Sequence, residues 1–166
     1  MINKIKSMIF SYVFVISKKP IKLSLLLEAN QAILENMYLD GKKLGFRLKS
    51  NRAYIVFVIL VNITMVPLGL MTHELFKVAD CHLSIFLAIF ITASIFAFFG
   101  LFKDWLKEEV GKQRIKQMWK LHFPLFPYEQ YHIIVDEIYQ DAIENNIQKQ
   151  ELERYLLDEL SKKCNK

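Results

Sequence analysis

Residues 53–72 read AYIVFVILVNITMVPLGLMT, and residues 83–102 read LSIFLAIFITASIFAFFGLF. Both stretches lack Asp, Glu, Lys and Arg, and each contains 13 residues of the types Val, Ile, Leu, Met and Phe. A helix of about 20 residues is about 30 Å long, which matches the hydrocarbon core of a bilayer. The two stretches therefore predict two transmembrane helices, joined as a hairpin by the loop 73–82. A helical hairpin buried in a soluble protein is the alternative, but the remaining chain is too short to surround it.

Charge is distributed unevenly around these two spans. The chain has 166 residues, of which 53% are hydrophobic and 23% are charged, and its mean hydropathy is +0.20. Residues 1–52 carry ten Lys or Arg against three acidic residues, and residues 103–127 carry six against three. Residues 128–166 carry five against nine. Basic residues thus bracket the apolar middle, which indicates a chain that lies partly in lipid and partly in water.

The basic flanks predict the orientation of the spans, because short loops rich in Lys and Arg stay in the cytoplasm. Lys77 is the one basic residue in the loop between the spans, whereas many basic residues flank the spans on the other side. These are Lys42, Lys43, Arg47, Lys49 and Arg52 before the first span, and Lys103, Lys107, Lys112, Arg114, Lys116 and Lys120 after the second. We therefore expect a multi-pass protein of the plasma (inner) membrane with both termini in the cytoplasm. The same charges can attract anionic lipid headgroups, and nucleic acid is not an expected partner because topology already explains them.

The interiors of the spans offer little polar chemistry. Their main polar residues are Asn62 and Thr64 in the first span, and Thr92 and Ser94 in the second. Coupled transport of protons or ions uses ionisable groups at membrane depth, and neither span contains one. A self-contained transporter is therefore not expected. A subunit of an oligomeric pore or transporter, with these four side chains lining the path, remains an alternative.

Small residues recur at a spacing of four along the second span, and this spacing lets helices approach closely. The pairs are Ala88 with Thr92 and Ala93 with Ala97. We expect these four residues to pack the two spans together or to face a partner. In the first span, Pro67 should kink the helix, because proline removes a backbone hydrogen bond.

The N-terminal arm predicts two amphipathic helices. The first carries an apolar stripe at helical spacing, formed by Ile5, Met8, Ile9, Tyr12, Val13 and Ile16. Its apolar run is too short to span a membrane, and Lys18-Lys19-Pro20 stands where a signal-peptide cleavage site would need small residues. We expect an uncleaved helix that lies on the cytoplasmic leaflet or is buried against the spans or a partner. The second helix should cover residues 23–38.

The C-terminal tail predicts three further helical segments. The first continues the second span over residues 103–122, and Phe123-Pro-Leu-Phe-Pro127 should end it. Two amphipathic helices follow, separated by a turn at Asn145-Asn146, and form an acidic helical hairpin within residues 128–166. A hairpin this small needs further contacts, so it should dock on the 103–122 helix, the N-terminal arm, another copy or a partner. The side chains expected to carry this docking are Tyr131, Ile134, Ile138, Leu152, Tyr155 and Leu156.

The loop between the spans concentrates side chains of metal-binding types, within THELFKVADCH at residues 72–82. His73 and His82 offer ring nitrogens and Cys81 a thiolate, a donor set that suits zinc or copper. The spacing matches no common metal motif, so a polar turn without a cofactor is the main expectation. A metal-handling or redox-sensing membrane protein that works through these three residues remains an alternative.

The rest of the sequence does not predict an enzyme. Glu129 and His132 form an E-x-x-H pattern, but di-iron helical bundles need two such patterns and two further glutamates. The sequence also lacks a glycine-rich phosphate loop and a CxxC motif.

Together these features predict an all-α integral membrane protein in four segments. They are an N-terminal arm (1–52), a transmembrane hairpin (53–102), a juxtamembrane helix with a proline linker (103–127) and a cytoplasmic helical hairpin (128–166). The expected function is that of a non-catalytic accessory or scaffold subunit. Its cytoplasmic helices would dock a protein partner or another copy of the chain, while the spans contact the lipid bilayer.

Overall fold

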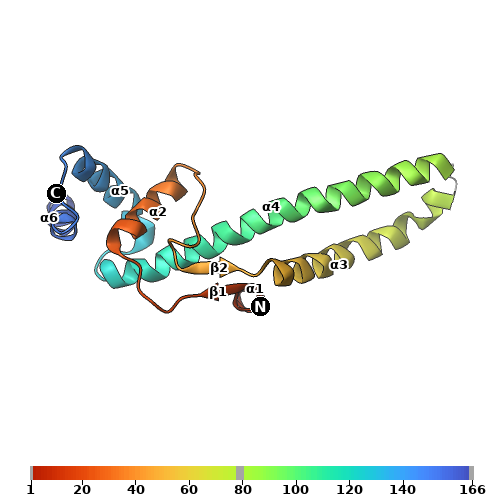
Figure 1. Cartoon of the computed structure of the whole chain (residues 1–166), viewed down its shortest axis with the longest axis horizontal. Helices are drawn as coiled ribbons and strands as arrows, with labels where there is room; N and C mark the ends of the chain where they lie inside the picture. Colours follow the sequence, from red (N-terminus) through yellow and green to blue (C-terminus); the bar gives the residue numbers. More distant parts are fainter. Residues whose placement is uncertain (1, 78–80, 165–166) are drawn as a thin grey trace. The chain divides into compact units, whose positions relative to one another are not determined.

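The computed structural model describes residues 2–77 and 81–164, with side chains described for residues 4–71 and 85–163. The chain is mostly helical, and two of its helices are long and apolar enough to cross a membrane. In chain order the elements are α1 (Ile2–Val13), β1 (Phe14–Ile16), α2 (Leu23–Leu34), β2 (Phe46–Leu48), α3 (Ser50–Lys77), α4 (Cys81–His122), α5 (Tyr128–Glu144) and α6 (Leu152–Cys164) (Figure 1).

The contacts of the chain divide it into two compact units. Unit 1 combines Met1–Val15 with Leu48–Lys107, and unit 2 combines Ile16–Arg47 with Glu108–Lys166. Each unit therefore draws on both the N-terminal arm and α4. The four segments expected from the sequence are each contiguous in the chain, whereas each compact unit combines two separate segments.

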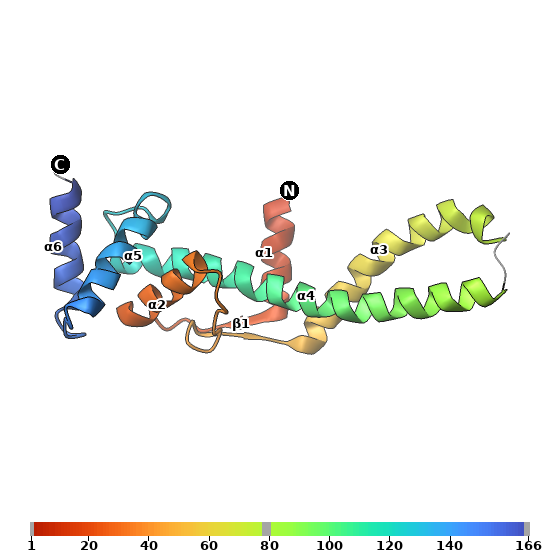
Figure 2. The same cartoon turned by 90° about the horizontal axis from the view of Figure 1, so that it is seen from above.

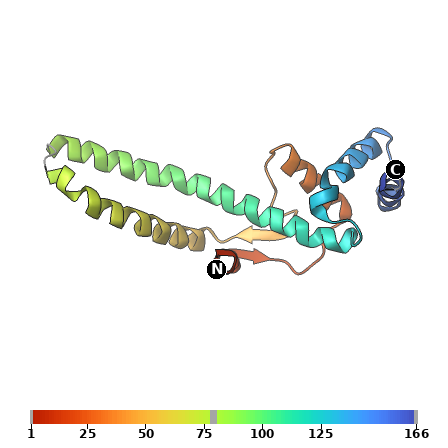
Figure 3. The ribbon, with the colours of Figure 1, turned by 180° about the vertical axis from the view of Figure 1, so that it is seen from behind.

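The helix expected over residues 5–16 is wrong at its C-terminal end, where the chain turns into a strand. Helix α1 ends at Val13, and β1 pairs with β2 in a two-stranded sheet (Figure 3). The Ser17 N–H donates to the Gly45 carbonyl at 2.7 Å, and the Lys49 N–H donates to the Val13 carbonyl at 2.9 Å, so the strands run antiparallel. The β-branched and aromatic residues of the FVI segment favour this extended backbone.

Helix α2 ends at Leu34, earlier than the expected residue 38, because an asparagine closes it. Asn36 has a φ of 53°, in the left-handed region that asparagine tolerates. The Met37 N–H then donates to the Ala32 carbonyl at 2.7 Å, in the pattern that commonly ends helices.

The turn expected at Asn145-Asn146 is confirmed. Like the end of α2, it contains an asparagine with a left-handed backbone. Asn146 has a φ of 54°, and the Ile147 N–H donates to the Ala142 carbonyl at 2.9 Å. Helix α5 packs against α6 after this turn and also against α2; Figure 2 shows α5 and α6 next to each other. Docking of this pair on the N-terminal arm was one of the expected arrangements.

Helix α4 is continuous from Cys81 to His122, so the second apolar stretch and the basic segment after it form one helix. It ends directly before Phe123-Pro, as the prolines predict. Helix α3 is also longer than its apolar stretch and includes Pro67 within it.

Unit 2 has a well-defined apolar core. The largest fully buried side chains in it include Trp119, Phe123, Leu26, Ile138 and Leu156. The indole N–H of Trp119 donates to the carbonyl of Phe126 at 2.8 Å, which satisfies the one polar atom of that ring. The core thus combines residues from α2, α4, α5 and α6.

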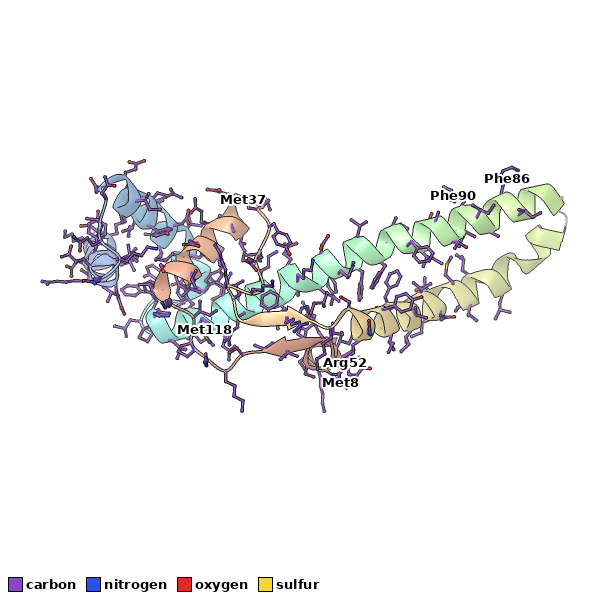
Figure 4. All side chains as sticks on the ribbon, in the orientation of Figure 1. Met8, Met37, Arg52, Phe86, Phe90 and Met118 are labelled. Carbon is purple, nitrogen blue, oxygen red and sulfur yellow. The ribbon has the colours of Figure 1, made fainter. Side chains whose placement is uncertain are left out.

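Unit 1 buries a smaller set of side chains, where α1 packs on α3. Phe10 and Val13 of α1 are buried, while Met8 on the same helix is exposed. The guanidinium of Arg52 lies 4.9 Å from the ring centre of Tyr12 and donates to the Tyr12 carbonyl at 3.1 Å. Figure 4 shows Arg52 and Met8 at this junction of α1 and α3.

Candidate functional site

Four polar side chains in the apolar stretches of α3 and α4 donate hydrogen bonds within their own helices. Asn62, Thr64, Thr92 and Ser94 each donate to the carbonyl oxygen four residues earlier, at distances from 2.7 to 3.0 Å. These donors already have an acceptor, so they do not need a polar ligand. The alternative in which the four residues line a polar path stays a prediction.

An apolar cavity lies between α3 and α4 in unit 1, and we call it the α3–α4 groove. The two helices meet through aromatic rings, since the Phe57 ring centre lies 5.3 Å from that of Phe99 and 5.4 Å from that of Phe102. The cavity measures about 680 Å³. Its lining includes Val61, Thr64 and Met65 from α3, and Phe90, Ser94 and Ile95 from α4.

A second cavity extends the groove to α1. It measures about 450 Å³ and is lined by α1, α3 and α4. Both cavities share the lining residues Leu60, Phe102 and Trp105. Lys6 of α1 is the charged side chain in the lining of the second cavity. The apolar surface thus leads to a cation at one end.

The small residues of α4 are not among the residues that line the α3–α4 groove. Ala88, Thr92, Ala93 and Ala97 are all exposed, and so is Phe86, which Figure 4 shows on the side of α4 away from α3. Both roles expected for the small residues, packing between the spans and contact with a partner, stay predictions.

The residues expected to dock a partner are placed mainly inside unit 2. Ile138, Leu152 and Leu156 are buried, while Tyr131, Ile134 and Tyr155 are half-buried. The helical stripe therefore contributes to the core of the unit itself. Unit 2 exposes other large apolar side chains. Four of them are aliphatic side chains of residues 121–143, which we call the exposed apolar set: Leu121, Leu125, Ile133 and Ile143; the others are Ile16, Met37, Tyr38 and Leu157.

The exposed apolar set could have been recognised in part from the sequence. Leu125 lies between two prolines, outside any helical stripe, and 84% of its surface is exposed. Leu121 and Ile133 lie on helices, but at positions that are off the stripe that packs into the core.

Arg114, which the sequence indicates only as one of the basic residues after the second span, is a buried charge. It is 4% exposed, and burial lowers the pKa of its guanidinium. Its donors reach the carbonyls of Ser17, Lys19 and Leu44 and the side chain of Gln117. Because backbone oxygens use these donors, Arg114 connects segments of unit 2 and does not offer a free anion site.

The Glu129 and His132 side chains have different partners. Glu129 accepts from the ammonium of Lys116 at 3.0 Å, and this bond lowers the pKa of the Glu129 carboxyl. The Nδ1 atom of His132 lies 2.9 Å from the Tyr128 carbonyl, and its ring stacks on that of Tyr128. The pair is therefore engaged with neighbours and does not form a joint ligand set.

Within the described residues, no group of three or more His, Cys, Asp or Glu side chains is placed to hold a metal ion. The candidate metal ligands His73, Cys81 and His82 lie outside the residues whose side chains are described. Comparison of the chain with models of protein families, with curated proteins and with solved structures found no match. The α3–α4 groove and the exposed apolar set are therefore the features from which a function can be argued.

Proposed function

We propose that the chain is a two-span membrane accessory or scaffold protein whose unit 2 docks a partner protein or another copy on the cytoplasmic side. In this proposal α3 and α4 form a transmembrane hairpin, and both termini lie in the cytoplasm. The observation that carries it is the exposure of the two apolar helices. Within Ser50–Met71, only 6% of the apolar 18-residue stretch is buried in the chain, and within Ile85–His122 none of the corresponding stretch is buried. A soluble fold buries helices of such apolarity, whereas a bilayer covers them.

The docking role is supported by the surface of unit 2. The exposed apolar set presents branched aliphatic side chains on a unit that already has its own core. Contiguous exposed apolar patches mark protein–protein contact sites, and the proposal assigns the exposed apolar set to such a site. The basic flanks support the cytoplasmic assignment of this unit.

The topology can be tested with the two native cysteines. Cys81 directly follows the connection between α3 and α4, and Cys164 lies at the end of α6. A thiol reagent that does not cross membranes should label Cys81 in intact cells and Cys164 only after lysis. The variants Cys81→Ser and Cys164→Ser assign each signal. Labelling of Cys164 in intact cells, or release of the chain from membranes by carbonate, would contradict the proposal.

The docking role can be tested by photo-crosslinking in cells. A photoreactive phenylalanine at Leu125 or Ile133 should give a discrete cross-linked product, either with a partner or with another copy. The same residue at Arg154 is the matched control, because its side chain is 89% exposed but lies outside the exposed apolar set. Equal products from Arg154, or no product from Leu125 and Ile133, would argue against docking through this surface.

A further inference from the structure

We infer that the α3–α4 groove holds one acyl chain of an anionic phospholipid from the cytoplasmic leaflet, with the headgroup beside Lys6. This inference rests on the proposed placement of α3 and α4 in the bilayer. It adds a specific lipid partner to a region that was otherwise expected only to contact bulk lipid.

The lining of the groove selects a hydrocarbon ligand. Thr64 and Ser94 are its polar lining residues, and both hydroxyls donate to carbonyls of their own helices. The remaining lining residues are aliphatic or aromatic, apart from the thioether of Met65 and the indole of Trp105. A polar ligand would lose its hydrogen bonds with water there without gaining new ones. An acyl chain has no hydrogen bonds with water to lose.

The length of the groove suits an acyl chain. Along α4 the groove extends from Phe90 to Trp105, which is about 22 Å at 1.5 Å per residue. The groove measures about 680 Å³, which leaves room for a thin hydrocarbon chain. Its length also exceeds the ~15 Å hydrocarbon depth of one leaflet.

The charges at the α1 end of the groove favour an anionic headgroup. Lys6 lines the cavity that continues the groove, together with Trp105, a residue type enriched at membrane interfaces. The segments of unit 1 that adjoin this end carry further cations and one carboxylate, Asp104. The cations are Lys4, Lys49, Arg52, Lys103 and Lys107. A phosphate-bearing headgroup placed here would meet a mainly positive surface.

The acyl-chain site can be tested by filling the groove. Val61 lines it, whereas Val66 on the same helix is exposed and outside the lining. The full chain is purified in mild detergent, delipidated and mixed with phosphatidylglycerol, and bound lipid is counted by native mass spectrometry. We expect about one lipid per chain in the wild type and in Val66→Trp, and at least a fivefold loss in Val61→Trp. Equal losses in both variants, or no retained lipid in the wild type, would overturn the inference.

The headgroup site can be tested by removing one charge. Lys6→Gln should lower the preference for phosphatidylglycerol over phosphatidylcholine about fivefold, which corresponds to about 1 kcal/mol. Lys4→Gln removes the same charge from the same helix at an exposed position outside the lining, so it should lower the preference clearly less than Lys6→Gln does. Equal effects of the two substitutions would show non-specific attraction to anionic lipid and would contradict the site.

The outcomes distinguish this inference from the function on which it rests. If the chain resists carbonate extraction and shows the expected cysteine labelling but retains no lipid, the lipid site is contradicted and the proposed function stands. Displacement of the lipid by a cross-linked second copy at Val61 would assign the groove to self-association instead, and would also overturn the lipid site. Release of the chain from membranes by carbonate would contradict both the lipid site and the proposed function.

Discussion

The Nη2 atom of Arg114 on α4 lies 2.7 Å from the carbonyl oxygen of Ser17, a residue 97 positions earlier in the chain. The same atom donates to the Lys19 carbonyl at 2.9 Å, and Nε lies 3.4 Å from the Leu44 carbonyl. A buried guanidinium thus binds the two segments that flank the β1–β2 sheet. Burial lowers the pKa of this guanidinium, and an arginine side chain stays protonated in proteins.

Replacement of Arg114 by Met should destabilise unit 2 by about 2–4 kcal/mol, because buried carbonyls lose their donors. Arg114→Lys should recover only part of this, since one ammonium cannot reproduce the spread of a guanidinium. Lys112→Met is the control: its pair with Glu108 is solvent-exposed and should contribute little. Urea unfolding followed by Trp119 fluorescence in a Trp105→Phe background reports unit 2, because Trp119 is buried there. Equal midpoints for the Arg114 and Lys112 variants would contradict the role of Arg114.

Unit 2 should become less stable as the pH rises, because Asp136 of α5 is partly buried near Asn30 of α2. The Oδ1 atoms of Asn30 and Asp136 are both buried without a hydrogen-bond partner among the described residues. Burial, and then the charge of Glu35, raises the pKa of Asp136, against smaller opposing effects of Gln140 and Asn30. The folded state therefore binds the proton more tightly than the unfolded state does. The resulting stability is complete below the ordinary Asp pKa of about 3.9 and is lost as the pH rises through the higher folded-state value.

Asp136→Asn should remove this pH-dependent loss and raise the urea midpoint of unit 2 at pH 7, because the amide carries no charge to desolvate. Asp141→Asn, at an exposed position on the same helix, should keep the loss. The measurement is the Trp119 unfolding midpoint between pH 3 and pH 7. A wild-type midpoint that rises with pH in parallel with that of Asp136→Asn would show that Asp136 is not the group responsible.

Close packing at Gly111 should make a side chain there destabilising. A Cβ at this position would lie 2.7 Å from Leu39 Cδ1, and Leu39 is itself buried. Gly111→Leu should therefore cost about 1–3 kcal/mol through overpacking. Gly100→Leu is the control on the same helix, because no atom lies within 4 Å of a Cβ there. A loss of unit 2 stability from Gly100→Leu as large as that from Gly111→Leu would show that packing against Leu39 is not the cause.

The left-handed residue between α5 and α6 should tolerate glycine but not alanine. Asn146 has a φ of 54°, where a Cβ costs roughly 1–2 kcal/mol and glycine has no such cost. We expect Asn146→Ala to lower the stability of unit 2 by about that amount and Asn146→Gly to leave it nearly unchanged. Asn145→Ala, at a φ of −81°, should have a smaller effect than Asn146→Ala. The opposite order of the two alanine variants would contradict this explanation.

The sequence predicted the features that depend on local pattern. Long uncharged stretches predicted α3 and the first part of α4, and Phe123-Pro predicted where α4 ends. The turn at Asn145-Asn146 was also predicted, because asparagine tolerates the left-handed backbone. These predictions succeeded because each depends on residues that are close together in the chain.

The features that the sequence did not predict depend on partners distant in the chain. The apolar residues of β1 also fit the helical period, so the sequence predicts a helix there. Their pairing with β2 depends on residues about 30 positions later in the chain. The hydrogen bonds of Arg114 are equally non-local. The predicted docking residues follow from the apolar stripe of the helices. An apolar stripe does not distinguish a surface that contacts a partner from one that packs into a core. Ile138 and Leu156 belong to the stripe and are buried in the core of unit 2.

The internal hydrogen bonds of Asn62, Thr64, Thr92 and Ser94 bear on how the chain is made. In the proposed transmembrane placement, a donor that is bonded inside its own helix does not need an acceptor on a neighbouring helix. These four bonds therefore place no requirement on the order in which the two helices enter the bilayer.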